Sequence, residues 1–298
     1  MKIKTYFLES RPQFLILSVV LVFLGTAMGW YDGYTNVTYT FLTLIGLLLL
    51  HTSTNILNDY SDYKSGIDLN TERTPFSGGS GFITSGKISA REALYLGIVS
   101  FAFAVPIGAF FIYVKGWELI PLFTIGAVFV LLYTSHITKF GMGIPEISAG
   151  LGLGTLPVLG VYIILNGGIT PSILYASIPS GILVFNLLFL NEFPDADADK
   201  KGGRKTIPII MGKDKSAVLY MILNILLYTW IVCGVIFNVM PEFSLIALLT
   251  APLAVKAVSG TFAHSVKEKM IPAQGANVAV VLLTQVLIGT GYILSKVI

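Results

Sequence analysis

The chain has 298 residues, of which 54% are hydrophobic and 12% are charged, with a mean hydropathy of +0.80 and a net charge of +3. Soluble domains carry about 25% charged residues, so this composition excludes a soluble enzyme, a nucleic-acid-binding protein and a disordered chain, and it indicates a polytopic membrane protein. The single cysteine, Cys233, lies in an apolar run, which excludes a disulfide framework and a cysteine-ligated zinc site.

Nine apolar segments predict membrane-spanning helices, because about 20 helical residues cross the roughly 30 Å hydrocarbon layer. Their apolar residues are continuous rather than alternating, which favours helices over a β-barrel. The expected spans are 12–31, 37–58, 91–114, 117–135, 146–166, 171–193, 215–238, 242–260 and 275–295. Pro252, Lys256 and Gly260 interrupt the eighth. We therefore expect an all-α polytopic membrane protein that forms a single domain over residues 1–298.

Basic residues lie almost entirely on one side of these spans. Seventeen of the 19 Lys and Arg residues fall on the side of the N-terminus, and only Lys115 and Lys296 fall on the other. The positive-inside rule places the basic side, with the N-terminus, in the cytoplasm. We expect an integral protein of the cell (inner) membrane.

Two long hydrophilic connections lie on the basic side, at about 59–90 and 194–214. Connections longer than about 12–15 residues are usually functional or disordered, and neither of these is of low complexity. We expect them to form cytoplasmic caps, which places the functional site toward the cytoplasm. Residues 73–89 are rich in Gly and Ser, which suits a cap whose N–H groups face phosphate oxygens and equally suits a flexible linker.

Each connection begins with an acidic motif at the end of an apolar helix. An Asn is followed by an Asp four residues later and by another Asp three or four residues after that, and this spacing places all three on one helical face. The two faces consist of Asn55, Asp59 and Asp62 in the first motif, and of Asn191, Asp195 and Asp199 in the second. Asp197 is out of phase with the second face and is expected to face water or a neighbouring group.

The motifs have the chemistry of a site for magnesium and a diphosphate. Clustered carboxylates repel one another unless a cation holds them, and oxygen ligands without Cys or His suit Mg²⁺, which completes its shell with water and phosphate oxygens. The expected metal ligands are Asp59, Asp62, Asp195 and Asp199. The residues expected to contact diphosphate oxygens directly are Lys64, Arg73, Lys201 and Arg204. Asp68 lies beyond Gly66, and whether the chain bends back to bring it to the diphosphate stays open.

The doubled aspartate motif resembles that of the UbiA superfamily of intramembrane prenyltransferases, and the resemblance covers nearly the whole chain. It implies that Mg²⁺ and an isoprenyl diphosphate bind between the motifs, and that the lipid chain occupies a central cavity open sideways to the bilayer. The Gly66-x-Asp68 ending and the segment from Gly143 to Tyr162, which carries Glu146, are similar to the 1,4-dihydroxy-2-naphthoate polyprenyltransferase branch of menaquinone biosynthesis. That branch commonly has Asn, a variable residue and Arg where this chain has Glu192-Phe193-Pro194.

The resemblance implies Mg²⁺-dependent transfer of a polyprenyl group from an isoprenyl diphosphate to an aromatic acceptor such as 1,4-dihydroxy-2-naphthoate. Geranylgeranylglyceryl phosphate is the alternative acceptor within the superfamily. An ion-coupled transporter is the rival from another class, but it predicts ionisable residues near the bilayer midplane, whereas most acids here gather at one membrane face. The expected partners are the diphosphate, the acceptor and membrane lipid, with no nucleic acid and with the oligomeric state left open.

Four side chains have two interpretations each. Asn55 and Asn191 can orient aspartates or contact the diphosphate, or they can form interhelical hydrogen bonds. Tyr133 can face a developing allyl cation with its ring, or it can serve as a packing residue. Glu146 can line the entrance for the acceptor, or it can lie at a helix start, where the helix dipole favours a carboxylate.

Overall fold

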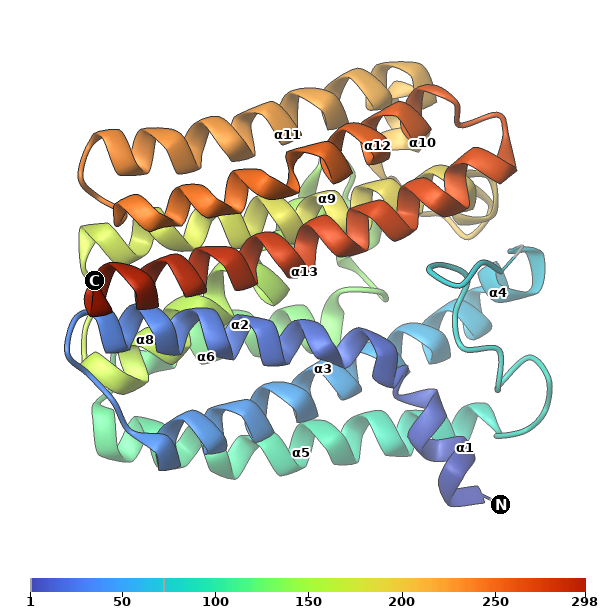
Figure 1. Ribbon diagram of the computed structural model, residues 1–298. Helices are drawn as coiled ribbons and strands as arrows, with labels where there is room; N and C mark the ends of the chain where they lie inside the picture. The colour runs from blue at the N-terminus through green and yellow to red at the C-terminus, as the bar shows by residue number, and fades with distance from the viewer. Residues whose placement is uncertain (1, 72) are drawn as a thin grey trace.

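The computed structural model describes residues 2–71 and 73–298, and the regular elements of this part of the chain are helices, with no strand. The long helices run side by side (Figure 1). The two ends of the chain lie at opposite ends of this bundle. The bundle is therefore built as the apolar segments predict, and it has two distinct ends.

The helices differ widely in length. The long ones are α2 (Pro12–Tyr31), α3 (Val37–Ser65), α5 (Ala90–Lys115), α9 (Pro171–Lys201), α11 (Lys213–Ile236) and α13 (Lys267–Val297). The shorter ones are α1 (Lys2–Glu9), α4 (Ile67–Asn70), α6 (Leu119–Leu132), α7 (Ile144–Gly150), α8 (Leu156–Asn166), α10 (Ile207–Met211) and α12 (Ala251–Phe262). Two 3₁₀ segments and one π segment complete the set: η1 (Ile137–Lys139), η3 (Glu242–Thr250) and η2 (Leu151–Thr155).

Eight helical segments of the described chain are long and apolar enough to cross a membrane. The expected span 117–135 differs from this set, because its helix α6 has 14 residues and rises only about 21 Å, less than the hydrocarbon thickness of roughly 30 Å. Two other expected spans are composite. The segment 146–166 contains α7, η2 and α8, and the segment 242–260 begins as the 3₁₀ helix η3 and continues as α12.

The helices that carry the acidic motifs continue beyond their expected ends. Helix α3 runs to Ser65 rather than 58, and α9 runs to Lys201 rather than 193, so the motif aspartates are helical instead of lying in cap loops. Pro194 lies inside α9, which a long membrane helix tolerates when neighbouring groups compensate for the lost N–H. Helix α3 ends at Gly66, whose φ of 78° suits a residue without a Cβ. Among the described residues, the irregular part of the first cap is thereby reduced to residue 71 and residues 73–89.

A π-helical segment interrupts the fifth expected span where it crosses α9. A Cβ on Gly150 would lie 2.6 Å from the carbonyl oxygen of Gly181, and one on Gly154 would lie 2.5 Å from that of Ser180. Only glycine allows the two backbones to approach so closely. Because π segments are often found at functional sites, the crossing of this segment with α9 is a candidate part of the functional site.

Two lysines stabilise the end of the bundle opposite the motifs. The Lys115 ammonium donates to the carbonyl oxygen of Leu165 at 3.3 Å, and the Lys296 ammonium donates to those of Trp30 and Tyr31 at 2.6 and 2.8 Å. Each ammonium therefore satisfies carbonyl groups at the last turn of a neighbouring helix, where the helix dipole favours a cation.

Candidate active site

Arg204 joins the two acidic motifs. Its Nη1 donates to Asp199 Oδ1 at 2.8 Å, and its Nη2 forms an ion pair with Asp62 Oδ1. Both carboxyl groups are buried, with 6% of Asp62 and 2% of Asp199 exposed. Burial alone would lower the pKa of Arg204, but the charges of Asp62 and Asp199 outweigh it and raise the pKa above its ordinary value. The ends of α3 and α9, distant in sequence, therefore meet at one guanidinium group.

A sharp turn after α9 brings Arg204 back to the motif. Gly203, with a φ of 81°, follows the last turn of the helix, and the Arg204 N–H then donates to the Asp199 carbonyl oxygen at 3.0 Å. The next residue, Lys205, donates its N–H to the Thr138 carbonyl oxygen at 2.9 Å. A Cβ on Gly202 would lie 2.2 Å from Ile67 Cγ1, so the turn packs directly against α4.

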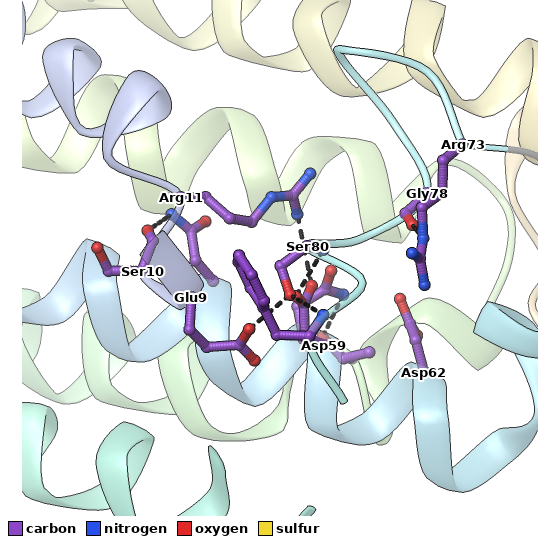
Figure 2. Close-up of polar contacts among 12 residues, drawn as sticks. Glu9, Ser10, Arg11, Asp59, Asp62, Arg73, Gly78 and Ser80 are labelled. Atoms are coloured by element: carbon purple, nitrogen blue, oxygen red, sulfur yellow. Dashed lines mark hydrogen bonds and ion pairs between the residues drawn. The ribbon is translucent and has the colours of Figure 1, made fainter. Parts of the chain in front are cut away.

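Asp59 is held from the other side by the N-terminal segment and the cap loop (Figure 2). The Ser80 N–H donates to Asp59 Oδ2 at 2.7 Å, and Arg11 Nη1 lies 3.7 Å from Asp59 Oδ1. The Ser80 hydroxyl donates to Glu9 Oε2 at 2.5 Å. The loop of residues 71–89 is thus fastened over the first motif instead of projecting into solvent.

Gly79 brings the loop backbone close to two carboxyl groups. A Cβ at this position would lie 3.1 Å from both Asp68 carboxylate oxygens and 3.4 Å from Asp59 Oδ1. Its φ of 73° also lies in the left-handed region. Asp68 therefore bends back toward the first motif, and its side chain lines the same cavity as Asp62.

The site contains more carboxyl groups than its cations neutralise. Burial and then the Asp59 charge raise the pKa of Glu9 to about 7. Burial, followed by the charges of Asp62 and Asp59, raises the pKa of Asp68 to about 8, although Arg73 and Arg204 oppose the shift. Such shifts show that an additional cation would stabilise the ionised cluster.

Carboxylate oxygens in the site have free lone pairs that a hard cation could use. Asp59 Oδ1 and Asp195 Oδ1 are buried and accept no hydrogen bond from the described residues. A donor set made of carboxylate and amide oxygens fits Mg²⁺. Within the described chain no three carboxyl, imidazole or thiol groups already enclose a metal position. Arg204 instead holds Asp62 and Asp199 together.

A cavity of about 290 Å³ extends from this cluster between the helices. Along α9 its wall changes from Val184, Leu187 and Leu188 to Asn191 and then to the aspartates. Apolar residues of other helices complete the deeper wall, among them Leu17, Leu47, Phe129, Val281 and Leu282. The cavity therefore has a charged end and an apolar interior, which suits a ligand with an anionic head and a hydrocarbon tail.

The two motif asparagines line the cavity and also link helices. Asn55 Nδ2 donates to the Ser10 carbonyl oxygen at 2.9 Å, and Asn191 Oδ1 accepts from Gln274 Nε2 at 3.1 Å. Tyr133 is another wall residue. Glu146 lies behind the wall, at the start of α7, where its Oε1 accepts the Ile207 N–H at 2.7 Å.

Three expected diphosphate contacts do not line the cavity. Lys64 and Lys201 are exposed at the ends of their helices. Arg73 donates to the Gly78 carbonyl oxygen at 3.1 Å and to the Thr84 hydroxyl, so it folds its own loop. Asp197 is confirmed as a solvent-facing residue, with 92% of its side chain exposed and Lys213 3.9 Å away.

Four further residues contact the motifs or their partners without any sequence pattern that predicts it: Glu9, Arg11, Ser80 and Gln274. Arg11 lies in the break between α1 and α2, in the left-handed region with a φ of 54°, and its side chain lines the cavity. The sequence indicates only that Arg11 belongs to the basic residues on the same side of the membrane as the two motifs. Glu9 and Ser80 carry no motif of their own, because their contact with Asp59 arises only when the loop folds back.

Comparisons with known proteins agree with this geometry. Among curated proteins, the chain is 29% identical over 269 residues to the 1,4-dihydroxy-2-naphthoate octaprenyltransferase of Bacillus subtilis (strain 168), covering 89% of this chain and 84% of that protein. It is 26% identical over 241 residues to the digeranylgeranylglyceryl phosphate synthase of Pyrococcus horikoshii, covering 76% of each chain.

Solved structures share the fold. A UbiA homologue from Aeropyrum pernix K1 superposes with a TM-score of 0.71 at 18% identity, over 95% of this chain and 98% of that one. A UbiA homologue from Archaeoglobus fulgidus bound to GPP and Mg²⁺ gives a TM-score of 0.62 at 14% identity, over 95% and 99%. The sequence model of the UbiA prenyltransferase family matches residues 15–278. The chain therefore belongs to the UbiA prenyltransferase family and is a prenyltransferase.

Proposed function

We propose that the protein transfers a polyprenyl group from an isoprenyl diphosphate to an aromatic acceptor such as 1,4-dihydroxy-2-naphthoate, with Mg²⁺ as the required metal. The observation that carries this proposal is the meeting of Asp62 and Asp199 at Arg204, at the charged end of an otherwise apolar cavity. The diphosphate binds at the charged end and the prenyl chain extends into the apolar interior.

In this proposal Asp59, Asp62, Asp195 and Asp199 hold Mg²⁺, which supplies positive charge against the diphosphate leaving group. Asp59 Oδ1 and Asp195 Oδ1, which accept no hydrogen bond from the described residues, support this assignment. The solved UbiA homologue with GPP and Mg²⁺ supports the choice of metal and donor.

Guanidinium groups of this chain bind the diphosphate directly. Arg204 Nε is buried and has no acceptor among the described residues, so one N–H remains available beside its two ion pairs. Arg11 lines the cavity next to Asp59. As the bond between the allylic carbon and the diphosphate breaks, these groups stabilise the negative charge that develops on the leaving oxygen.

The cap loop and the cavity wall protect the developing allyl cation from water. Phe76, Ser77 and Gly79 close the charged end, and the wall includes two aromatic residues, Phe129 and Tyr133, a class of side chain that can stabilise a cation. Asn55 and Asn191 anchor the two motif helices to their neighbours, Asn55 to the Ser10 carbonyl oxygen and Asn191 to Gln274 of α13.

An aromatic acceptor is favoured by the relative from Bacillus subtilis, whose name states 1,4-dihydroxy-2-naphthoate as its substrate. The relative from Pyrococcus horikoshii, named as a digeranylgeranylglyceryl phosphate synthase, supports a lipid acceptor as the second candidate. The strong excess of basic residues at the motif end supports a site at the cytoplasmic face of the cell membrane.

An acceptor panel tests the proposal. Purified protein is incubated with Mg²⁺ and one radiolabelled prenyl diphosphate, together with 1,4-dihydroxy-2-naphthoate, 4-hydroxybenzoate or geranylgeranylglyceryl phosphate. We expect Mg²⁺-dependent label in the dihydroxynaphthoate product and none after chelation by EDTA. Label only in the glyceryl phosphate product would replace the aromatic acceptor with the lipid, and label in none of the three would overturn the proposal.

A further inference from the structure

Two buried glutamates lie beside the cavity, one turn deeper than the aspartates. Glu192 precedes Asp195 by three residues on α9 and lines the cavity, and Glu146 lies in the first turn of α7 behind it. Glu192 is 4% exposed and Glu146 is fully buried. Neither residue is one of the motif aspartates, and the i, i+3, i+7 spacing of Glu192, Asp195 and Asp199 places Glu192 on the same cavity-facing side of α9.

These carboxyl groups have too few hydrogen-bond donors. Glu146 Oε1 accepts the Ile207 N–H at 2.7 Å, whereas Glu146 Oε2 and Glu192 Oε2 accept nothing from the described residues. The two side chains lie within hydrogen-bonding reach of each other. An ionised carboxylate only accepts hydrogen bonds. Negative charge on these carboxyl groups must therefore be met by donors or cations outside the pair.

The surroundings compensate only part of this charge. The other ionisable groups facing the pair are Arg204, Asp199 and the Tyr133 hydroxyl. Arg204 is already engaged by Asp62 and Asp199. A buried carboxylate without full compensation is costly, and an amide at position 192 would avoid that cost. A ligand that donates a hydrogen bond to the Glu192 carboxyl group would therefore stabilise it.

The depth of Glu192 matches the position of the incoming nucleophile. Three helical residues correspond to about 4.5 Å along the axis, so Glu192 lies just below the aspartates that face the diphosphate. The reacting prenyl carbon is bonded directly to that diphosphate, and an attacking atom must approach it to about 3–3.5 Å. Of the carboxyl groups on the described cavity wall, Glu192 is the deepest along α9.

We propose that Glu192, supported by Glu146, binds the hydroxyl group of the acceptor substrate and so selects acceptors that carry a hydrogen-bond donor at or next to the nucleophilic atom. The inference rests on the proposed prenyl transfer and names the group that positions the acceptor. The dihydroxynaphthoate carries a hydroxyl next to its nucleophilic ring carbon, and in the glyceryl phosphate the hydroxyl oxygen is itself the nucleophile. The carboxylate accepts a charge-assisted hydrogen bond from the hydroxyl group, and such a bond is stronger than one between neutral groups.

Steady-state kinetics of Glu192→Gln test this role. Glutamine keeps the size of the side chain and can donate to Glu146, but it lacks the charge. We expect the KM for the acceptor to rise about 10- to 100-fold, because hydrogen bonds to charged groups contribute about 1.5–3 kcal/mol, while the KM for the prenyl diphosphate changes less than about twofold. Asp197→Asn on the exposed face of α9 is the matched control and should leave both constants unchanged.

An acceptor analogue supplies a second readout. Wild-type protein should transfer the prenyl group to 1,4-dihydroxy-2-naphthoate far better than to its dimethyl ether, and Glu192→Gln should lose most of this discrimination. If the glyceryl phosphate is the working acceptor, the rise of its KM in Glu192→Gln is the readout, because its hydroxyl oxygen is the nucleophile and cannot be methylated without abolishing the reaction. Glu192→Asn is used in the same assays if the glutamine variant fails to fold, as judged by size-exclusion chromatography.

The possible outcomes distinguish a failure of the proposed prenyl transfer from a failure of the acceptor role of Glu192. Wild-type transfer to neither acceptor would overturn the proposed function and this inference with it. Wild-type transfer combined with an unchanged acceptor KM in Glu192→Gln, or with an equal rise in the KM for the diphosphate, would overturn the acceptor role alone.

Discussion

The two acidic motifs are similar in sequence but are held in different ways. The second motif brings its own cation, because Arg204 lies five residues after Asp199 and binds it directly. The first motif depends on distant segments, since Asp59 is held by Ser80 of the cap loop and by Arg11 before α2. The difference indicates that the second motif is the fixed half of the site, whereas the first is completed only when the loop and the N-terminal segment close over it.

Breaking the bridge between the motifs should have the largest effect. Arg204→Gln leaves Asp62 and Asp199 buried without their cation, and breaking a buried ion pair in this way costs about 3–5 kcal/mol. We expect a lower Tm in detergent and a loss of transfer activity of about 100-fold or more. Lys205→Gln, which changes the exposed neighbouring side chain, is the control. A stable and active Arg204→Gln protein would contradict the bridging role.

Alanine substitution of one aspartate in each motif separates loss of a metal ligand from release of the cap loop. Asp59→Ala and Asp195→Ala should each reduce prenyl transfer about 100-fold, since each removes a proposed metal ligand. Asp59→Ala removes the acceptor of the Ser80 N–H and should release the loop, whereas Asp195→Ala removes a hydrogen bond to the Ser77 side chain of the same loop and should release it less. Limited trypsin digestion at Arg73 and Lys87 measures this release. Cleavage of Asp59→Ala at the wild-type rate would show that Asp59 does not fasten the loop.

A pair of glycine substitutions separates loop strain from carboxylate contact. Gly79→Ala and Gly86→Ala both place a Cβ at a φ near 70°, a strain of about 1–2 kcal/mol. Only the Cβ at Gly79 meets Asp68 and Asp59, while that at Gly86 meets nothing within 4 Å. We therefore expect about a tenfold higher KM for the prenyl diphosphate in Gly79→Ala and little change in Gly86→Ala.

The smallest effect is expected for Arg73→Gln. In the sequence, Arg73 and Arg204 each follow one of the two motifs, but Arg73 is exposed and donates only to its own loop. Loss of these hydrogen bonds should cost about 1 kcal/mol and reduce activity a few-fold. A loss as large as that of Arg204→Gln would show that Arg73 reaches the diphosphate when substrate binds.

Local patterns predict the helices of this protein better than their ends. Apolar length predicts the membrane-spanning character, because it depends only on the chain and the bilayer. The continuation of α9 through Pro194 and the shortness of α6 are not evident from the sequence, since both depend on contacts with neighbouring helices.

In the candidate site, too, features that depend on local spacing can be predicted from the sequence, and contacts between distant segments cannot. The helical spacing of Asp195 and Asp199 can be derived from the sequence, and it places both on the cavity wall. The contact of Arg204 with Asp62 could not be derived, because it joins segments 142 residues apart through the packing of α3 against the turn after α9. Glu9 and Ser80 also escaped prediction, since nothing in their local sequence refers to Asp59.

The anchored lysines at the far end of the bundle influence how a charged substrate reaches the protein. Lys115 and Lys296 are tied to carbonyl oxygens and lie over the rings of Tyr39 and Trp30 at 5.2 and 5.4 Å. Three acids share that end, Asp32, Glu118 and Glu242, so it carries a net charge of −1 (2 − 3) and the other end +4 (17 − 13). The net positive charge at the motif end favours the approach of an anionic substrate from that side through electrostatic steering.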